Sequence, residues 1–200
     1  MKYQYTIHKD EKAYRGFFKF NRYTVSFEKF GGGMIENVIR ECSKKGNVVS
    51  VLPYDPVRQE FLMVEQFRIG MVVREKHPWT LEVVAGFMDI DGETPEETAK
   101  RELLEETGCT AIKLYPLINY YPSPGGSASK NYIFLATVDS SQALETTGIT
   151  EEGEDIYVHK IPLSVMREKL KKGEINNSTA IIALQQFFME NQAEKLQSDI

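Results

Sequence analysis

The stretch GFMDIDGETPEETAKRELLEETG, residues 86–108, decides how the rest of the chain is interpreted. Thr94, Pro95 and Glu97 follow the pattern of a capping box: a hydroxyl caps the first turn, proline takes the first helical position, and an acid lies three residues after the cap. Gly108 is a typical helix stop. The pattern therefore predicts one helix that begins at Pro95 and ends just before Gly108.

Three glutamates gather near the end of this predicted helix. Glu105 and Glu106 lie three and four residues after Glu102, so all three carboxylates fall within one arc of the helix. Like charges at this spacing destabilise an isolated helix by a few tenths of a kcal/mol per pair, and at the C-terminal end they also oppose the helix dipole. A hard divalent cation such as Mg²⁺ would offset this repulsion. The alternative is a solvated acidic face balanced by Lys100 and Arg101.

Bulk properties limit the classes of function. The 200 residues favour a single domain, or one domain with an added lobe, and a net charge of −5 disfavours nucleic acids and anionic membranes as partners. Cys42 and Cys109 lie far apart and outside any CxxC pattern, which argues against a disulfide framework or a zinc knuckle. No secretory signal or membrane-length apolar run is visible. We therefore expect a cytoplasmic protein.

The remaining chain alternates mainly between predicted strands and turns. Aromatic and β-branched residues dominate the opening third, with a hairpin-type break at GGG, residues 31–33. Further strands are expected in NVVSVLPYD, EFLMVEQFRI, WTLEVVAG, AIKLYPLINYYPSPGG, KNYIFLATV and IYVHKIP. Helices are expected in LSVMREKLKKG and in STAIIALQQFFMENQAEKL. Mixed strands with three helices predict a single α/β or α+β sandwich that carries an N-terminal sheet.

The stretch around the acidic helix resembles the signature of the Nudix hydrolases. That signature contains a glycine, a glutamate a few residues later, seven further residues, and then Arg-Glu-apolar-x-Glu-Glu-x-Gly. The residues in register are Gly86, Glu93, Arg101, Glu102, Leu103, Glu105, Glu106 and Gly108. Six residues separate Gly86 from Glu93, whereas the usual spacing is five. Because the extra residue falls in a loop, where insertions are well tolerated, the helix pattern is unaffected.

The resemblance extends over nearly the whole chain to the ADP-ribose pyrophosphatase and nucleoside-diphosphate-sugar branch of that family. Matching segments include YRGFF, IRE, LPYDPVRQE, VEQFRI, PWTLEVVAG, SPGG, EEGEDI and ALQQ. The resemblance implies an α/β fold: a Nudix α/β/α sandwich with an N-terminal antiparallel β-sheet region that is exchanged between the subunits of a homodimer. Residues 1–46 would serve dimerisation and nucleotide-base contacts, and residues 47–200 would form the catalytic domain.

The resemblance also implies a metal site. Its Mg²⁺ ligands, for which Mn²⁺ is a substitute, would be the side chains of Glu102, Glu106 and Glu154 and the backbone carbonyl of Ala85. Glu105 would be a further ligand or would support the ligands, and Arg101 would hold the carboxylates by charge-assisted hydrogen bonds. An ordinary surface arginine is the alternative for Arg101. Glu93 is as readily structural as functional.

A second acidic cluster, TEEGEDI, follows residue 149. Within it the resemblance implies Glu152 as the general base and Glu154 as a metal ligand. Hydrolysis of a diphosphate needs a positioned water, a carboxylate in hydrogen-bonding reach of it, and cations that neutralise the phosphate oxygens. Glu151 and Asp155 are close enough for the base to be one position away. A solvated acidic turn is the alternative.

Four residues would bind the substrate by the same resemblance. Arg68 matches a diphosphate clamp, for which an arginine fork is better suited than lysine. Arg40 and Phe18 match positions that hold the adenine by hydrogen bonding and stacking, partly across subunits, although a phenylalanine in a strand is more often a core residue. Ser123, in SPGG, would lie near the terminal ribose.

The leading prediction for function is Mg²⁺-dependent hydrolysis of ADP-ribose to AMP and ribose 5-phosphate. The close alternative keeps this chemistry on GDP-mannose or on a broad set of nucleoside-diphosphate sugars. After SPGG this chain has SAS and then Lys130, where related enzymes often carry a glutamate, so the sugar preference is not transferred. A nucleotide-sugar sensor without catalysis is less favoured because it would not need both acidic clusters.

Overall fold

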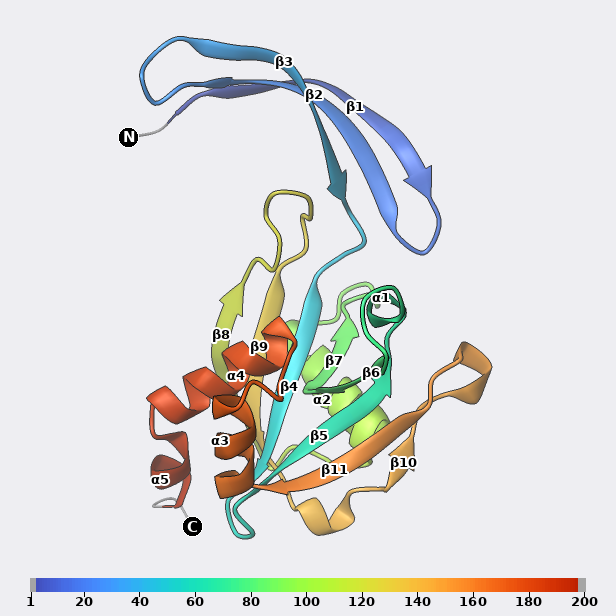
Figure 1. Cartoon of the computed structure of the whole chain (residues 1–200), viewed down its shortest axis with the longest axis vertical. Helices are drawn as coiled ribbons and strands as arrows, with labels where there is room; N and C mark the ends of the chain where they lie inside the picture. The colour runs from blue at the N-terminus through green and yellow to red at the C-terminus, as the bar shows by residue number, and fades with distance from the viewer. Residues whose placement is uncertain (1–2, 198–200) are drawn as a thin grey trace. The chain divides into compact units, whose positions relative to one another are not determined.

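The structure is a computed structural model that describes residues 3–197, apart from the side chain of Glu152. The chain divides into two compact units, which are described separately (Figure 1). The first joins the chain up to Asn47 with Tyr120–Asn131, and the second joins Val48–Asn119 with the chain from Tyr132 onward.

The first unit is built on a three-stranded antiparallel sheet in the order β1-β2-β3. Its strands are β1 (Tyr5–Arg15), β2 (Lys19–Glu28) and β3 (Met34–Ser43), so the predicted N-terminal strands are confirmed. Gly32 and Gly33 have φ angles of 86° and 79°, which explains the glycines in the β2–β3 hairpin. The 120–131 segment joins this unit because the Ser43 N–H donates to the Gly126 carbonyl at 2.9 Å.

The second unit is built on an eight-stranded sheet. Six strands follow the order β10-β11-β5-β4-β9-β8, while β6 pairs with β5 and β7 pairs with β4. The strands are β4 (Val48–Asp55), β5 (Glu60–Phe67), β6 (Trp79–Glu82), β7 (Val84–Phe87), β8 (Lys113–Tyr120), β9 (Asn131–Thr137), β10 (Thr146–Thr147) and β11 (Ile156–Pro162). The helices are α1 (Ile69–Val72), α2 (Pro95–Thr107), α3 (Leu163–Lys171), α4 (Ser178–Met189) and α5 (Gln192–Gln197), with short 3₁₀ turns η1 (Ser140–Gln142) and η2 (Thr150–Glu152).

Helices cover both faces of this sheet, with α2 on one face and α3 and α4 on the other (Figure 1). Leu62 and Val64 of β5 belong to the buried cluster that contains Leu103 of α2. Strand residues alternate between faces, so Phe61 points the other way, and its ring lies 4.9 Å from that of Phe187 in α4. The α/β class and the sandwich arrangement predicted from the resemblance are therefore confirmed.

The helix that carries the acidic cluster matches its prediction closely. The Thr94 side chain accepts the Glu97 N–H, the Glu97 carboxylate accepts the Thr94 N–H, and Pro95 begins α2. Gly108 ends the helix in the left-handed region with φ of 74°. Local sequence alone determines these bounds, because the cap, the proline and the glycine each act on the neighbouring backbone.

Several other elements differ from the predictions, including α1, which begins at Ile69 where the strand was expected to continue, and β10, which lies where a loop was expected. WTLEVVAG is not one strand: it changes partner at Val83, with β6 paired to β5 and β7 paired to β4, and it runs on to Phe87. The expected final helix is two helices, because Asn191 takes a positive φ of 51° between α4 and α5. Within residues 3–197, no helix combines the length and apolar character needed to cross a bilayer.

Candidate active site

Arg101 organises the carboxylates around α2. Its guanidinium donates to both oxygens of Glu93, at 3.1 Å and 3.2 Å, and to Glu102 Oε1 at 2.7 Å. It also donates to Glu105 Oε2 at 3.1 Å, and its Nη2 lies 3.8 Å from Asp89 Oδ1. The predicted contacts of Arg101 with the helix glutamates are present. A planar fork of five N–H donors suits such a hub.

Glu102 is pressed against the backbone of Gly86 in β7. A Cβ added at Gly86 would lie only 1.9 Å from both Cδ and Oε1 of Glu102. Glu102 is also 9% exposed, so its carboxylate is enclosed between the strand and Arg101. Burial raises the pKa of Glu102, the positive charge and hydrogen bond of Arg101 oppose that rise, and Glu105 adds to it.

Glu106 is buried one helical turn further along α2. Its Oε2 accepts the N–H of Ala85 at 3.1 Å, which ties the helix to β7. Burial raises the pKa of Glu106 to about 8, and the negative charges of Glu102 and Glu154 add to the rise, although the Ala85 N–H and Arg68 oppose it. Buried carboxylates that lie close together are favourable for a cation that binds through oxygen.

Arg68 lies at the end of β5 and forms a fork with a residue of β6. Its Nε donates to Glu82 Oε1 at 3.0 Å and its Nη2 donates to Glu82 Oε2 at 2.9 Å. The hydroxyl of Thr80, which is 4% exposed, also donates to Glu82 Oε1. Burial lowers the pKa of Arg68, but the hydrogen bond and charge of Glu82 and the charges of Glu106 and Glu154 outweigh it and raise the pKa. Arg68 is therefore within electrostatic reach of the α2 carboxylates.

The acidic loop is shaped by two glycines with positive φ. Gly148 has φ of 102°, Gly153 has φ of 75° and ends η2, and the Glu154 N–H donates to the Ile149 carbonyl at 3.1 Å. The charge of Glu154 is felt by both Glu106 and Arg68, so this loop residue and α2 belong to one electrostatic site. The Glu152 side chain lies outside the described part of the chain, so its predicted role stays a prediction.

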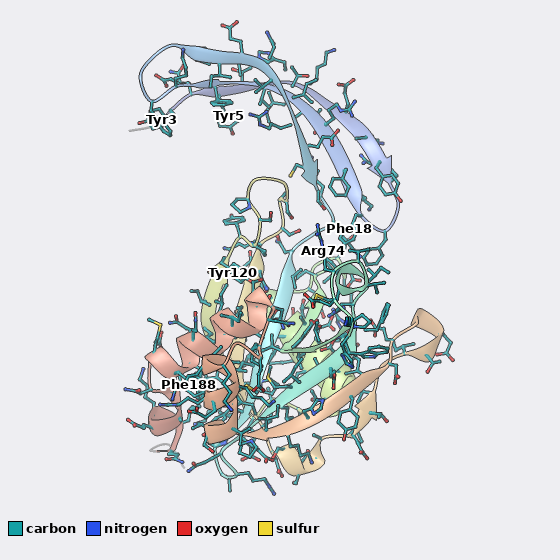
Figure 2. All side chains as sticks on the ribbon, viewed as in Figure 1. Tyr3, Tyr5, Phe18, Arg74, Tyr120 and Phe188 are labelled. Carbon is teal, nitrogen blue, oxygen red and sulfur yellow. The ribbon has the colours of Figure 1, made fainter. Side chains whose placement is uncertain are left out.

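The other predicted substrate residues lie in the first unit. Arg40, in β3, donates from Nη1 to the Ile39 carbonyl at 2.9 Å. Phe18 lies in the β1–β2 connection (Figure 2) and is 48% exposed. Its ring packs edge-on against that of Phe17, with ring centroids 5.1 Å apart. The Ser123 carbonyl accepts the N–H groups of the turn that follows it. The second unit holds the other predicted residues, namely Arg68, Ala85, Arg101, Glu102, Glu105, Glu106, Glu152 and Glu154.

The donor set fits a hard divalent cation completed by other oxygens. Two buried carboxylates, Glu102 and Glu106, flank the backbone of β7 at Ala85 and Gly86. Among the described residues, no three His, Cys, Asp or Glu side chains are grouped closely enough to hold a metal by themselves. Magnesium sites with one or two carboxylates are completed by phosphate oxygens and waters, so a pair of carboxylates is a sufficient protein contribution.

Some contacts in this site were not anticipated from the sequence. The sequence predicts only a strand for Thr80 and Glu82. A glutamate among Leu81, Val83 and Val84 is nevertheless a signal, because a charged side chain in an apolar strand needs a charged or hydrogen-bonding partner. The close approach of the Glu102 carboxylate to Gly86 depends on how α2 packs on β7, so no local sequence pattern predicts it. Glu93 is a main partner of Arg101, a contact that is compatible with either of the two roles predicted for it.

The structure thus combines an α/β/α sandwich with two buried helix carboxylates, Glu102 and Glu106, that lie against the backbone of β7. A family model described as the NUDIX domain matches residues 44–179. The chain therefore belongs to the Nudix family of hydrolases, and the resemblance described from the sequence is confirmed.

Within the Nudix family, the chain is similar to several pyrophosphatases. The chain is 36% identical over 185 residues to the ADP-ribose pyrophosphatase of Escherichia coli (strain K12), covering 92% of this chain and 88% of that relative. It is 37% identical over 179 residues to the ADP-ribose pyrophosphatase of Haemophilus influenzae, covering 88% and 82%. The GDP-mannose pyrophosphatase of Enterobacter sp. (strain 638) is 32% identical over 180 residues, covering 90% and 92%. A solved structure entitled "Crystal structure of ADP compounds hydrolase" shares the fold, with a TM-score of 0.73, 22% identity and 96% coverage of both chains.

Proposed function

We propose that this chain hydrolyses the diphosphate bond of ADP-ribose, with Mg²⁺, to give AMP and ribose 5-phosphate. The observation that carries the proposal is the pair of buried carboxylates, Glu102 and Glu106, held between Arg101 and the β7 backbone. The names of the relatives at 36% and 37% identity support ADP-ribose as the substrate.

The cation would be held by oxygen ligands from α2, β7 and the acidic loop. Its ligands would be the carboxylates of Glu102 and Glu106 and the carbonyl of Ala85, and Mn²⁺ could substitute for Mg²⁺. Because Glu154 is not grouped with the two helix carboxylates in the structure, it would join them as a ligand only when the cation is bound. When bound, the cation supplies positive charge against the phosphate oxygens. Arg101 fixes Glu102 and Glu105 in place, so the position of the Glu102 carboxylate is set without the cation. The raised pKa of Glu106 supports this assignment, because a nearby cation would favour its ionised form.

Glu152 would act as the general base, accepting a proton from the attacking water, and Glu154 would contact the cation. Glu151 and Asp155 are its neighbours in the same loop. Glu152→Gln should lose turnover with little loss of metal affinity, measured by Mn²⁺ titration beside single-turnover rates. If Glu154→Gln gave that pattern instead, the two roles would be exchanged.

Four residues would bind the substrate. Arg68 would clamp the diphosphate, and its position within reach of the charges of Glu106 and Glu154 supports this. Arg40 and Phe18 would hold the adenine, and Ser123 would contact the terminal ribose. The exposure of the Phe18 ring, at 48%, is suitable for stacking on a base.

The active form would be a homodimer in the cytoplasm, in which the N-terminal strands exchange between subunits. Residues 1–46 would provide dimerisation and base contacts, and residues 47–200 would provide catalysis. Tyr5, Ile7, Tyr14 and Ile39 of the N-terminal sheet are 52–72% exposed, and such an apolar surface supports a protein partner. Cys42 and Cys109 are free thiols, which supports a reducing compartment.

GDP-mannose is the second candidate substrate, favoured by the relative of that name at 32% identity over 90% of the chain. A panel of nucleoside-diphosphate sugars, read as kcat/KM with Mg²⁺, separates the two. We expect ADP-ribose to be preferred, and Glu106→Gln to remove turnover while the thermal midpoint persists. A higher kcat/KM for GDP-mannose would reverse the substrate assignment, and binding without hydrolysis would favour a sensor.

A further inference from the structure

The fork between Arg68 and Glu82 has a role that the proposed reaction leaves unassigned. We propose that Glu82, oriented by Thr80, is a positioning residue that aims the Arg68 guanidinium at the diphosphate of the substrate. This role rests on the proposed function, because it needs a diphosphate bound beside α2.

The strands fix the geometry of this pair. Glu82 is paired with Val64 and Thr80 with Gln66 in the β5–β6 register, so both side chains lie on the face that carries Val64. Val64 belongs to the buried cluster that contains Leu103 of α2. Glu82 and Thr80 are therefore on the α2 side of the sheet, as Glu102 and Glu106 are.

The hydrogen bonds leave one edge of Arg68 available for a ligand. Glu82 accepts from Nε and Nη2, at 3.0 Å and 2.9 Å. An arginine has five N–H donors, so three remain, on Nη1 and on the outer position of Nη2. Two of these donors, one on Nη1 and one on Nη2, form the end-on edge of the guanidinium, which matches two phosphate oxygens in a bidentate arrangement.

The surrounding charge explains why Arg68 needs an anchor. Glu106 and Glu154 act on Arg68 electrostatically, and both are proposed to bind the cation. An unanchored guanidinium would pair directly with one of these carboxylates and compete with the cation. Glu82, whose side chain is 16% exposed, occupies the other edge of the guanidinium and holds it in one orientation.

Thr80 provides a further hydrogen bond to Glu82. Its hydroxyl donates to the same Glu82 oxygen that accepts from Arg68 Nε. A second donor at this oxygen fixes the rotation of the carboxylate. Glu82 thus faces a donor on each side, and its orientation is transmitted to Arg68.

Glu82→Gln tests the role, with Glu65→Gln as the matched control. Glu65 lies on the same β5–β6 ladder but on the opposite face, where it pairs with His159 at 2.7 Å. For Glu82→Gln we expect KM for ADP-ribose to rise about tenfold, kcat to change by less than about threefold, and the Mg²⁺ half-saturation to rise. Glu65→Gln should leave these values unchanged. Thr80→Val should repeat the Glu82→Gln pattern in weaker form, and Thr80→Ser, which keeps the hydroxyl, should restore most of the loss.

A double-mutant cycle tests whether Glu82 acts on the substrate through Arg68. If Glu82 acts through Arg68, then adding Glu82→Gln to Arg68→Gln has little further effect. Binding of ADP-ribose in the presence of EDTA, measured by calorimetry, gives a second readout without metal, and Glu82→Gln should weaken it about as much as it raises KM. The inference would be overturned if the double mutant raised KM by the product of the two single-mutant increases. An unchanged KM for Glu82→Gln would overturn it as well.

The two proposals fail in different ways. If Glu106→Gln abolishes hydrolysis while Glu82→Gln behaves as the wild type, only the positioning role is wrong. If the wild type hydrolyses no nucleoside-diphosphate sugar, the proposed function is wrong and the positioning role falls with it.

Discussion

Replacing Gly86 by alanine should disable the site while leaving the fold in place. The new Cβ would lie 1.9 Å from Cδ and Oε1 of Glu102 and 2.4 Å from Oε2. Ordinary contact begins near 3.4 Å, so the carboxylate must move by about 1.5 Å. Displacement of a catalytic group by about 1 Å can cost about 100-fold in rate. We therefore expect kcat/KM for ADP-ribose to fall by about 100-fold or more.

The cost to stability should be small for two reasons. The atom that gives way is the end of a flexible side chain, and Gly86 is not among the glycines with positive φ. We expect the free energy of unfolding to change by less than about 1 kcal/mol. Urea denaturation measures this change, and Mn²⁺ titration should show weaker metal binding.

Gly31→Ala is the matched control, because nothing lies within 4 Å of its added Cβ and its φ is not positive. It should retain the activity and stability of the wild type. Wild-type turnover in Gly86→Ala would refute the reasoning, because it would show that the position of the Glu102 carboxylate does not matter for hydrolysis. A collapse of stability would refute it differently, by showing that the strand and not the carboxylate had given way.

Three further changes have defined outcomes. Burial raises the pKa of Asp55, but the N–H groups of Arg58 and Ser140 and their side chains outweigh it and lower the pKa to about 2. The ionised, 1% exposed carboxylate therefore adds about 2 kcal/mol of stability above pH 4, which is lost as pH falls from about 4 to about 2. Asp55→Asn should lower the free energy of unfolding at pH 7 by about that amount. It should also reduce the loss of stability between about pH 4 and about pH 2, measured by denaturation across this range. An unchanged loss of stability over that range would contradict the prediction. Thr94→Ala removes the cap of α2 and should cost about 1 kcal/mol, seen as a thermal midpoint lower by about 2–4 °C; no shift would mean that the capping box is dispensable. Arg101→Lys cannot bridge Glu93 and Glu102 with a planar fork, so kcat/KM should fall by about 10–100-fold, and full activity would show that the hub is unnecessary.

The sequence predicted those parts of the site that depend on local rules. Thr94, Pro95 and Gly108 act on adjacent backbone, so the bounds of α2 were readable. The arc of Glu102, Glu105 and Glu106 follows from helical spacing alone, and Arg101 lies within reach of that arc in any helix. These contacts needed no knowledge of tertiary structure.

Long-range contacts were not readable for the opposite reason. The change of strand partner at Val83 depends on where β4 and β5 lie, and residues 81–85, around Val83, contain no glycine or proline that would mark it. The fork of Glu82 with Arg68 joins residues 14 apart across a strand pair whose register is set by the fold. The break at Asn191 was likewise hidden, because a helical apolar stripe continues across it.

The most direct test of the central claim is the position of a bound metal ion. Crystals of the protein with Mn²⁺ and a non-hydrolysable analogue of ADP-ribose would reveal the ion by its anomalous scattering. The account predicts one peak within coordination distance of the Glu102 and Glu106 carboxylates, with the diphosphate oxygens beside it and Arg68 in contact. A peak elsewhere, with both carboxylates still bonded only to Arg101 and the Ala85 N–H, would contradict it.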